Sequence, residues 1–417
     1  MKRVRSGSIW LSMFFLAASF FVGTGYLHGR AAGARILAEI EEPPEILKLE
    51  EELPAALPVM GAAGDALPAL SAILLDQQQG TVLFSKSPDD PLPPASITKV
   101  MTLLLTMEAL EQGRLSGSDV ITASEYACSM GGSQIWLKPG EEMTVDDLLK
   151  AVCIASANDA SVALGEAVAG TNDAFVDMMN NRAQELGMEN TYFLNCTGLD
   201  EAGHVSTARD IAIMSRELMR HTQIRDYSTI WMDSLRDGAT ELVNTNRLVR
   251  FYGGTTGLKT GTTNGAGSCL SATAERDGMG LVAVVMGCPT SDQRFAAARS
   301  LLDYGFANYA MVPVPSIDEQ LTPVRVLQGK SYELNAIYEA PAAMVAPKAQ
   351  KDTLTQKVTL TADVQAPVQR GQLLGQVEVL LDGQVVQTYP LMAGEAVEKM
   401  TLGVAFGRLT AALAGNA

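Results

Sequence analysis

The sequence predicts a mixed α/β fold of the α+β type, in which an antiparallel sheet with a helical subdomain is followed by a small all-β domain. Strand-like patterns stand at both ends of residues 69–310, and helical patterns fill the stretch between them. This order indicates one sheet built from the two ends of a domain. From residue 311 the pattern changes to short alternating runs separated by glycine-containing turns, which is typical of a β domain. We therefore predict one domain at 69–310 and a second at 311–397.

Hydrophobic periodicity predicts the elements of the first domain in order. Residues 69–83 form an apolar run, a turn and a second short strand, which indicates a hairpin. Apolar residues at helical spacing predict helices over 97–112, 145–154, 160–169, 172–186 and 208–220. Strands return after Gly257, where 267–275 and 280–287 predict a second hairpin, and a helix over 293–304 ends the domain.

The first 68 residues predict a targeting segment and a linker. Basic residues precede an apolar run over 9–22 that is short for a membrane span, and Ala32-Gly33-Ala34 offers small residues for cleavage. We therefore expect residues 1–34 to be a signal peptide, with an uncleaved anchor as the alternative. Either way the body of the protein is exported. Residues 35–68 are rich in glutamate and proline and predict an acidic linker.

Composition argues against several classes of function. A net charge of −16 and a pI near 4.7 argue against a nucleic-acid partner. The chain has neither an H-E-x-x-H motif nor a Cys-x-x-Cys pair, so we expect no metal and no cofactor. Its five cysteines are irregularly spaced, and Cys269 and Cys288 lie on strands expected to be neighbours, where a disulfide is conceivable.

Three short motifs in a fixed order carry the chemistry: Ser96-Ile97-Thr98-Lys99, Ser156-Ala157-Asn158 and Lys259-Thr260-Gly261. A serine hydroxyl becomes a good nucleophile when a neighbouring base takes its proton. Residues three apart on a helix share one face, so Lys99 can reach Ser96. Lysine acts as a base only if its pKa falls, and both burial and a nearby positive charge such as Lys259 lower it. The first motif thus predicts a serine nucleophile that needs no histidine.

The other two motifs predict the rest of an acyl-transfer site. Ser156 can relay a proton to the leaving amine, and the amide of Asn158 can hold a substrate amide. Lys259 begins the third motif on a predicted strand, along which an extended peptide could pair. There its ammonium and the hydroxyls of Thr260 and Thr262 would meet a substrate carboxylate. Gly261 would let another backbone approach closely, and the N–H groups of residues 96 and 262 would form the oxyanion hole.

Each motif alone has a simpler explanation. Ser96 and Lys99 could be a helix cap with a surface lysine, Ser156 could cap the following helix, and Lys259 could lie in a solvated loop. Short motifs match by chance often enough that each simple explanation is favoured singly. All three motifs in this order, each in the right local context, reverse that preference.

Over most of residues 69–395 the chain closely resembles the low-molecular-weight penicillin-binding proteins that act as serine-type D-alanyl-D-alanine carboxypeptidases of the peptidase S11 type. The resemblance implies a serine β-lactamase/transpeptidase-like domain. The segments that carry it are 94–99, 132–133, 139–141, 156–160, 197–199, 204–208, 257–261, 294–295 and 301–306, with 366–368 and 371–372 in the β domain.

The resemblance also implies the substrate and the place of action. Ser96 would be acylated by a peptidoglycan stem peptide, the terminal D-alanine would leave, and water would release the shortened peptide. Lys99 would be the base, Ser156 the proton relay and Lys259 a substrate-binding charge, while Arg294 would help to hold the substrate carboxylate. β-Lactam antibiotics would trap the acyl-enzyme. The expected location is the bacterial cell envelope, on the outer face of the membrane or secreted.

The sequence departs from this family at two places. Thr262 stands where relatives often carry a tyrosine or histidine, and Gly254-Thr255-Thr256-Gly257 replaces a segment that is usually more acidic. Two other functions compete with hydrolysis of the stem peptide. A β-lactamase would need an E-x-x-L-N segment between Asn158 and Lys259, which is absent. A non-catalytic penicillin sensor would not need the intact Lys99, Ser156 and Lys259.

The C-terminal segment 398–417 differs from the β domain before it. Leu402, Phe406, Leu409 and Leu413 share one helical face. Two interpretations stand side by side: a helix that lies on a membrane surface, and a helix docked on the β domain.

Overall fold

The computed structural model describes residues 67–413. The predicted signal peptide at 1–34 and nearly all of the predicted linker at 35–68 lie outside the described residues. Among the helices of 67–413, none is long and apolar enough to cross a membrane.

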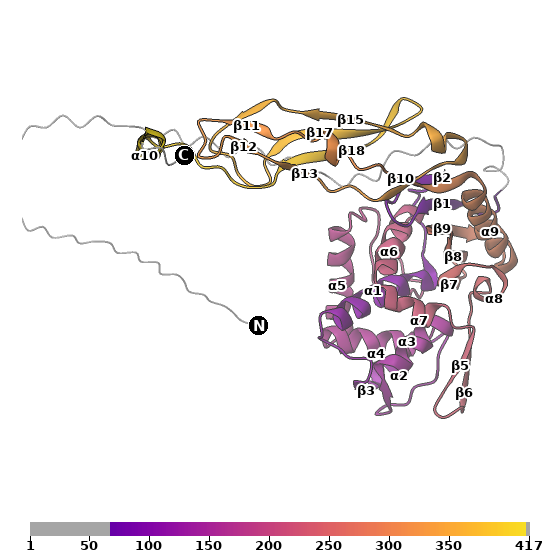
Figure 1. Ribbon diagram of the computed structural model, residues 1–417. Coiled ribbons are helices and arrows are strands. Elements are labelled where there is room, and N and C mark those ends of the chain that lie inside the picture. The colour runs from indigo at the N-terminus through magenta and orange to yellow at the C-terminus, as the bar shows by residue number, and fades with distance from the viewer. Residues whose placement is uncertain (1–66, 414–417) are drawn as a thin grey trace, which may run out of the picture. The chain divides into compact units, whose positions relative to one another are not determined.

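A five-stranded antiparallel sheet joins the beginning and the end of the first domain (Figure 1). Its order is β2-β1-β9-β8-β7. The strands are β1 (Ser71–Asp76), β2 (Val82–Lys86), β7 (Thr255–Thr263), β8 (Gly267–Arg276) and β9 (Met279–Cys288). β1 pairs with β9, so that Ser71 lies opposite Met286. The predicted fold class is therefore confirmed, and β7 is left at the edge of the sheet.

Helices and two short hairpins occupy the chain between β2 and β7. The helices are η1 (Ala95–Thr98), α1 (Lys99–Glu111), α2 (Glu125–Cys128), α3 (Val145–Ile154), α4 (Asn158–Ala169), α5 (Asn172–Glu185), α6 (Ala208–Arg220), η2 (Thr222–Ile224), α7 (Arg225–Ser228) and α8 (Leu248–Phe251). The hairpins are β3 (Val120–Thr122) with β4 (Glu142–Thr144), and β5 (Met232–Leu235) with β6 (Thr240–Val243). α9 (Ser291–Asn308) follows β9.

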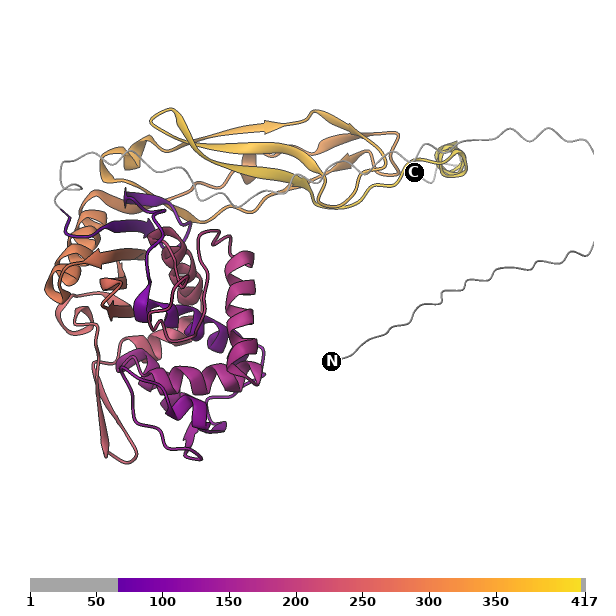
Figure 2. The same ribbon diagram turned by 180° about the vertical axis from the view of Figure 1, so that it is seen from behind.

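The sheet separates two apolar cores because successive strand residues point to opposite faces. On β1, Ile73 and Leu75 pack into the core that contains α1 and α6, whereas Leu74 packs into the core beneath α9. α9 accordingly covers the face of the sheet that is turned away from α1 and α6 (Figure 2). The continuous burial of β1, β8 and β9 follows from this double cover.

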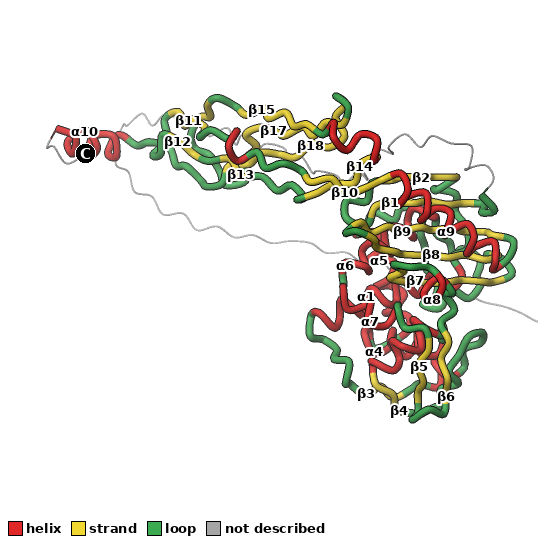
Figure 3. Tube along the Cα trace, turned by 45° about the vertical axis from the view of Figure 1, so that its right-hand side comes forward, coloured by secondary structure: helices red, strands yellow, loops and turns green. Residues whose placement is uncertain are grey.

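The second domain consists of short strands in three small sheets, coloured yellow in Figure 3. Their orders are β10-β14, β12-β11-β16 and β13-β18-β17-β15. The strands are β10 (Tyr309–Pro313), β11 (Val324–Leu327), β12 (Glu333–Leu334), β13 (Ala336–Ile337), β14 (Ala343–Pro347), β15 (Thr355–Leu360), β16 (Asp363–Gln365), β17 (Leu373–Leu381) and β18 (Gln384–Ala393). Two 3₁₀ turns, η3 (Asp318–Gln320) and η4 (Lys348–Thr353), join them, and α10 (Leu402–Leu413) comes last.

Several boundaries differ from those that the sequence predicts. The helix expected over 97–112 is a 3₁₀ turn followed by α1, which begins at Lys99. The helix expected over 293–304 runs from Ser291 to Asn308, because the Thr290 side chain caps it by accepting a hydrogen bond from Gln293 N. β7 begins at Thr255, before Gly257. Neither the β3–β4 pair nor the β5–β6 hairpin was predicted.

The cysteines are free thiols throughout the described chain. Cys269 packs in the core on the α1 side of the sheet, whereas Cys288 packs in the core beneath α9. The two side chains therefore face opposite sides of the sheet, and the conceivable disulfide between them is not formed.

Candidate active site

The Ser96 segment is a tight, buried turn. Ala95 has a left-handed φ of 50°, and its carbonyl oxygen packs against Gly198. A Cβ at position 198 would lie 1.8 Å from that oxygen, so only glycine fits there. Ile97 and Thr98 are buried, whereas Ser96 is half-buried and reachable by a substrate. The fold thus holds the serine rigidly at the surface of a packed turn.

Lys99, at the start of α1, points its amine at this serine. The distance from Lys99 Nζ to Ser96 Oγ is 3.1 Å. Lys99 Nζ also donates to Asn158 Oδ1 at 2.5 Å and to the Thr197 carbonyl at 2.6 Å. Both of these oxygens can only accept hydrogen bonds. A neutral amine has two N–H groups and one lone pair, so these two acceptors leave the lone pair for the Ser96 hydroxyl.

The surroundings of Lys99 favour that neutral form. Its side chain is fully buried. Burial, and secondly the positive charge of Lys259, hold the pKa of Lys99 well below the ordinary lysine value. Both causes were expected from the sequence. Lys99 therefore has the geometry that a general base for Ser96 needs, and the lowered pKa favours the neutral form that this role requires.

Asn158 links this pair to a loop on the other side of the cleft. Its Nδ2 donates to the Gly131 carbonyl at 2.6 Å, and its backbone N–H donates to the Ser133 carbonyl at 2.7 Å. The contact with Gly131 fixes the amide orientation and so turns Oδ1 toward Lys99. A Cβ at Gly132 would lie 2.8 Å from Asn158 Nδ2, so this loop approaches because position 132 is glycine.

The carboxylate of Asp159 holds the next part of the same loop. It accepts hydrogen bonds from Ile135 N at 3.2 Å and Leu137 N at 3.0 Å, and from Ala160 N at 2.9 Å. Asp159 is fully buried. No role was predicted for Asp159, because the loop groups that it holds, Ile135 N and Leu137 N, are main-chain groups more than twenty residues away.

Ser156 lies in the turn between α3 and α4. It has a left-handed φ of 63° and is 4% exposed. Non-glycine residues rarely adopt this conformation, and it recurs at functional sites. Among the described residues, its hydroxyl makes no hydrogen bond to Lys99. Its place beside Asn158 leaves a proton relay as its predicted role.

The third motif lies on the edge strand β7, directly against the serine turn. A Cβ at Gly261 would lie 3.0 Å from Ala95 Cβ and 3.1 Å from Ile97 N. The Thr260 hydroxyl donates to Thr245 Oγ1 at 2.8 Å. Lys259 is buried, and its Nζ donates to the Thr260 carbonyl at 3.1 Å. Burial, together with the charge of Arg294, lowers the pKa of Lys259 to about 7.

Arg294 reaches the same strand from α9. Its Nη1 donates to Thr262 Oγ1 at 2.7 Å and to the Gly261 carbonyl at 3.0 Å. The guanidinium is largely buried, and its Nε has no hydrogen-bond partner among the described residues. Burial lowers the pKa of Arg294 from the ordinary arginine value, but arginine remains charged. A buried cation with an unused donor fits a site for an anionic group.

Two further residues near the site were not predicted to act there. Arg247 lies over the Phe295 ring at 4.5 Å, and Arg294 lies over the same ring at 4.9 Å, so two cations meet at this end of the cleft. The Thr197 carbonyl is the other. Its role as a hydrogen-bond acceptor for Lys99 is carried by the main chain, which no residue pattern reveals.

His204 supports the serine turn from below. It accepts a hydrogen bond from Leu194 N at its Nδ1, so its Nε2 carries the proton and donates to Thr98 Oγ1 at 2.8 Å. Burial lowers the pKa of His204 to about 4, and the ring is therefore neutral at pH 7. These contacts give His204 a structural role.

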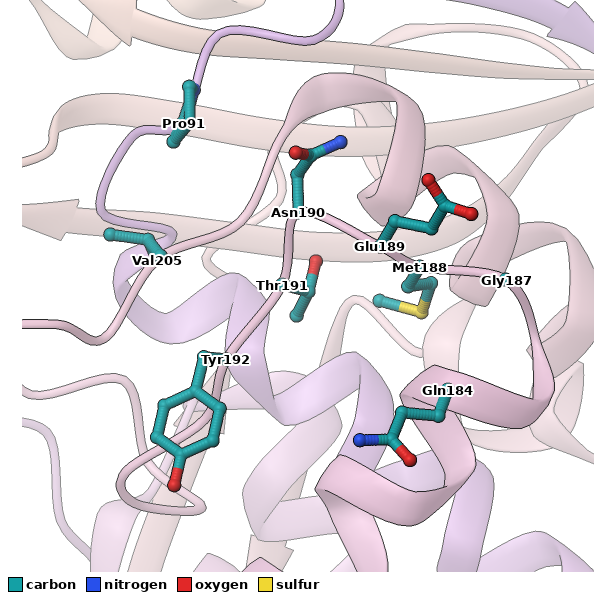
Figure 4. Close-up of a pocket in the computed structure, with 9 residues that line it drawn as sticks. All are labelled: Pro91, Gln184, Gly187, Met188, Glu189, Asn190, Thr191, Tyr192 and Val205. Atoms are coloured by element: carbon teal, nitrogen blue, oxygen red, sulfur yellow. The ribbon is translucent and has the colours of Figure 1, made fainter.

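A separate hollow of about 590 Å³ lies outside the catalytic cleft (Figure 4). It is lined by Pro91, Gln184, Gly187, Met188, Glu189, Asn190, Thr191, Tyr192 and Val205. None of these residues belongs to the three motifs. The charged side chain in the lining is Glu189, so the hollow does not suit the anionic end of a substrate.

Comparisons with known proteins agree with this geometry. The family model for D-alanyl-D-alanine carboxypeptidases of the peptidase S11 type matches residues 59–290. The model for the C-terminal domain of penicillin-binding protein 5 matches residues 309–399. The D-alanyl-D-alanine carboxypeptidase DacF of Bacillus subtilis is 42% identical over 335 residues, which cover 79% of this chain and 86% of that protein.

Solved structures resemble the chain as well. Penicillin-binding protein 5 of Haemophilus influenzae matches with a TM-score of 0.74 and 29% identity, over 83% of this chain and all of that one. Penicillin-binding protein D2 of Listeria monocytogenes in its ampicillin-bound form matches with a TM-score of 0.53 and 32% identity, over 58% of this chain and 98% of that one.

Proposed function

The chain belongs to the peptidase S11 family of D-alanyl-D-alanine carboxypeptidases, and we propose that Ser96, Lys99 and Ser156 carry out this hydrolysis on peptidoglycan stem peptides. The family acts on the wall polymer of the cell envelope. The observation that carries the assignment of the catalytic residues is the 3.1 Å contact between Lys99 Nζ and Ser96 Oγ, with both N–H groups of the neutral amine engaged by Asn158 and Thr197.

The first half-reaction acylates the serine. Neutral Lys99 takes the proton of Ser96 as Oγ attacks the carbonyl carbon between the last two D-alanines. Negative charge develops on the carbonyl oxygen, where the backbone N–H groups of residues 96 and 262 stabilise it. The Lys99 proton then passes by way of Ser156 to the nitrogen of the leaving D-alanine, and the C–N bond breaks. The products of this step are free D-alanine and an ester at Ser96.

The second half-reaction repeats these steps with water as the nucleophile. Lys99, again neutral after proton transfer, takes a proton from water, and the hydroxide attacks the Ser96 ester. The proton returns to Ser96 Oγ as the ester bond breaks, which releases the shortened peptide. Each step balances because the proton that enters at Lys99 leaves with the departing group.

Substrate binding falls to β7 and the residues around it. We assign the terminal carboxylate to Lys259, Thr260, Thr262 and Arg294, which supply cations and hydroxyl donors at one end of the cleft. Gly261 lets this strand lie against the Ser96 turn. Asn158 borders the opposite wall, where its amide is fixed by Gly131 and Lys99. An open sheet edge can add a peptide as a further strand, and β7 is such an edge.

β-Lactams are expected to acylate Ser96 in place of the peptide. The relative from Listeria was crystallised with ampicillin bound, and in this chain the amine of Lys99 contacts both Ser96 Oγ and Asn158 Oδ1. A β-lactamase function is disfavoured because the chain lacks an E-x-x-L-N segment between Asn158 and Lys259. Slow release of the penicilloyl ester is therefore expected.

The C-terminal helix supports association with a membrane surface. Leu402, Phe406, Leu409 and Leu413 are 92%, 67%, 57% and 80% exposed, so the apolar face of α10 is not packed on the β domain. Arg408, on another face, lies over Tyr332 at 5.3 Å. An amphipathic helix of this kind lies in the plane of a membrane interface. We therefore favour the membrane interpretation of residues 398–417 and an exported location.

The direct test is D-alanine release from a peptide that ends in D-Ala-D-Ala. The full chain, its Ser96→Ala variant and a Ser300→Ala control are compared, since Ser300 is an exposed serine of α9. We expect release from the native chain and the control, and none above background from Ser96→Ala. Stable penicillin labelling without any D-alanine release would instead favour a penicillin sensor.

A further inference from the structure

Beside the site, two loops are joined by a contact that the proposed reaction does not use. The loop that supplies the Thr197 carbonyl to Lys99 continues outward to Asp200. There Asp200 Oδ2 accepts a hydrogen bond from Gly265 N at 3.1 Å, in the turn between β7 and β8. A Cβ at Gly265 would lie 3.3 Å from the same oxygen, so the two segments are in close contact. Asp200 is exposed on its outer side.

The charges along β7 therefore differ in sign. Lys259 lies on this strand with Thr260, and Arg294 donates to the Gly261 carbonyl and to Thr262 farther along it. The carboxylate of Asp200 lies beyond the strand, in a position fixed by Gly265. A bound peptide with a carboxylate at its terminus and an ammonium some residues earlier would be aligned by these opposite charges.

The dimensions of a stem peptide suit this spacing. Thr260 and Gly265 are five residues apart, so they are separated by at most roughly 16 Å along an extended chain. The third residue of a stem pentapeptide precedes the terminal residue by two positions, or roughly 7 Å. A lysine-like side chain adds roughly 6 Å, so its amine reaches roughly 13 Å from the terminal carboxylate.

We propose that Asp200 recognises the side-chain ammonium of the third residue of the stem peptide. This inference rests on the proposed carboxypeptidase function. The ammonium is shared by the two residues that could supply it, lysine and diaminopimelate. Asp200 Oδ2 is occupied by Gly265 N, and Asp200 Oδ1 is the oxygen that meets the substrate amine. Asp200 is thus a specificity-determining residue.

A merely structural role for Asp200 can be separated from recognition. The Asp200→Asn variant retains an amide oxygen that accepts from Gly265 N but removes the negative charge. Glu201→Gln is the matched control, because Glu201 is an exposed neighbour whose carboxylate accepts instead from Asn195 Nδ2 at 3.3 Å. If the preference depended only on the total negative charge near residues 200 and 201, both variants would change it equally, because each removes one negative charge.

The experiment measures kcat/KM for D-alanine release from four Nα-acetyl tripeptides ending in D-Ala-D-Ala. Their first residues are lysine, Nε-acetyl-lysine, norleucine and meso-diaminopimelate. In the native chain we expect the free-amine peptides to react about fivefold faster than the acetylated and norleucine peptides, the discrimination that one partly exposed ion pair supports. Higher ionic strength should reduce this preference. The faster of the lysine and diaminopimelate peptides identifies the natural source of the amine.

In Asp200→Asn the preference should vanish, with rates for norleucine unchanged, and in Glu201→Gln it should persist. The proposal is overturned if the native chain treats all four peptides alike, or if Asp200→Asn keeps the preference. No release from any of the four would instead refute the carboxypeptidase function itself, so the two failures are distinguishable.

Discussion

Gly261 of β7 and Ala95 of the serine turn lie in direct contact, closer than two side chains would allow. A Cβ at Gly261 would meet the Ala95 methyl group and the Pro94 carbonyl at 3.0 Å each. Its neighbours there are backbone and a short side chain, which cannot rotate away. This contact sets the spacing between the nucleophile and the strand that holds the substrate.

Substituting Gly261 by alanine should therefore separate the two catalytic elements. A displacement of about 1 Å between reacting groups can cost on the order of a hundredfold in rate. Because the neighbours of a Cβ at Gly261 must give by only a few tenths of an ångström, we expect Gly261→Ala to lower the rate of Ser96 acylation by a smaller factor, on the order of tenfold, measured with a chromogenic β-lactam. Gly117→Ala is the control, since a Cβ there meets nothing within 4 Å. An unaltered acylation rate in Gly261→Ala would show that the turn can shift freely.

The two lysines predict a bell-shaped pH profile for kcat/KM. Lys99 must be neutral to act as base, so activity rises with pH through its lowered pKa. Lys259 must be charged to hold a carboxylate, so activity falls as pH rises through its pKa of about 7. The measurement is the rate of D-alanine release at low substrate concentration across pH 4 to 10. A profile that climbs steadily to pH 10 would contradict this assignment.

The Lys259→Met variant tests the coupling of the two lysines. It removes a positive charge that favours neutral Lys99, so the pKa of Lys99 should rise. The acidic limb of the acylation profile should then move to higher pH, and the basic limb near pH 7 should disappear. If the acidic limbs of the two pH profiles, for the variant and for the native chain, coincided, this interaction between the lysines would be ruled out.

His204 predicts an acid-sensitive fold. Its pKa is about 4 in the folded chain against 6.5 in a model peptide, so the unfolded chain binds the proton more readily. The contribution of neutral His204 is fully present above pH 6.5 and is lost as pH falls toward 4. It amounts to roughly 3 kcal/mol. Urea unfolding of the native chain and of His204→Gln at pH 7 and pH 4 should show a smaller loss in the variant, and equal losses would disprove the role.

Asp159 predicts a defect in both stability and binding. Ile135 N contacts both oxygens of Asp159, Leu137 N contacts Oδ2 and Ala160 N contacts Oδ1. In Asp159→Asn the amide nitrogen replaces one of these oxygens and cannot accept, so either Leu137 N or Ala160 N would be left buried and unpaired. We expect a loss of about 2 kcal/mol in the free energy of unfolding. The loop that borders Asn158 should loosen, so KM for the peptide should rise more than kcat falls. Thermal unfolding and steady-state kinetics measure the two effects, and a purely kcat defect would argue against loop positioning.

The exposed face of α10 predicts reversible binding to lipid. Replacing both Phe406 and Leu409 by glutamate removes apolar area and adds charge, so co-sedimentation with anionic vesicles should fall at least tenfold. Peptide hydrolysis in solution should stay unchanged, because the helix carries no site residue. The control is Leu373→Glu, an exposed leucine of β17 at 54% exposure. Equal lipid binding by all three chains would place the contact elsewhere.

The sequence predicts best where a local signal fixes an element. The helices at 145–154 and 208–220 have the predicted bounds, because Thr144 and Thr207 cap them and mark where each one begins. The three motifs likewise contain adjacent or helix-spaced residues, so their roles could be hypothesised without knowledge of the fold.

Other features depend on contacts that local patterns do not encode. β3 and β4 have three residues each, too few for a periodic pattern, and the connection 123–141 between them contains α2, so no short turn marks their pairing. Asp159 and the Thr197 carbonyl act through main-chain groups that come near only after folding. Asp200 gains its position from Gly265, which is 65 residues away.

The pairing of β1 with β9 has a consequence for the timing of activity during synthesis. The nucleophile emerges early, at Ser96, but the strand that supports its substrate site joins the sheet only after β8 and β9 have been made, at Cys288. Until then Lys99 lacks Lys259, the neighbour whose charge helps to lower its pKa. Ser96 also lacks β7, the edge strand expected to bind the substrate. A nascent or truncated chain that ends before β7 is therefore expected to be inactive. The protein would hydrolyse wall peptides or react with penicillin only once its first domain is complete.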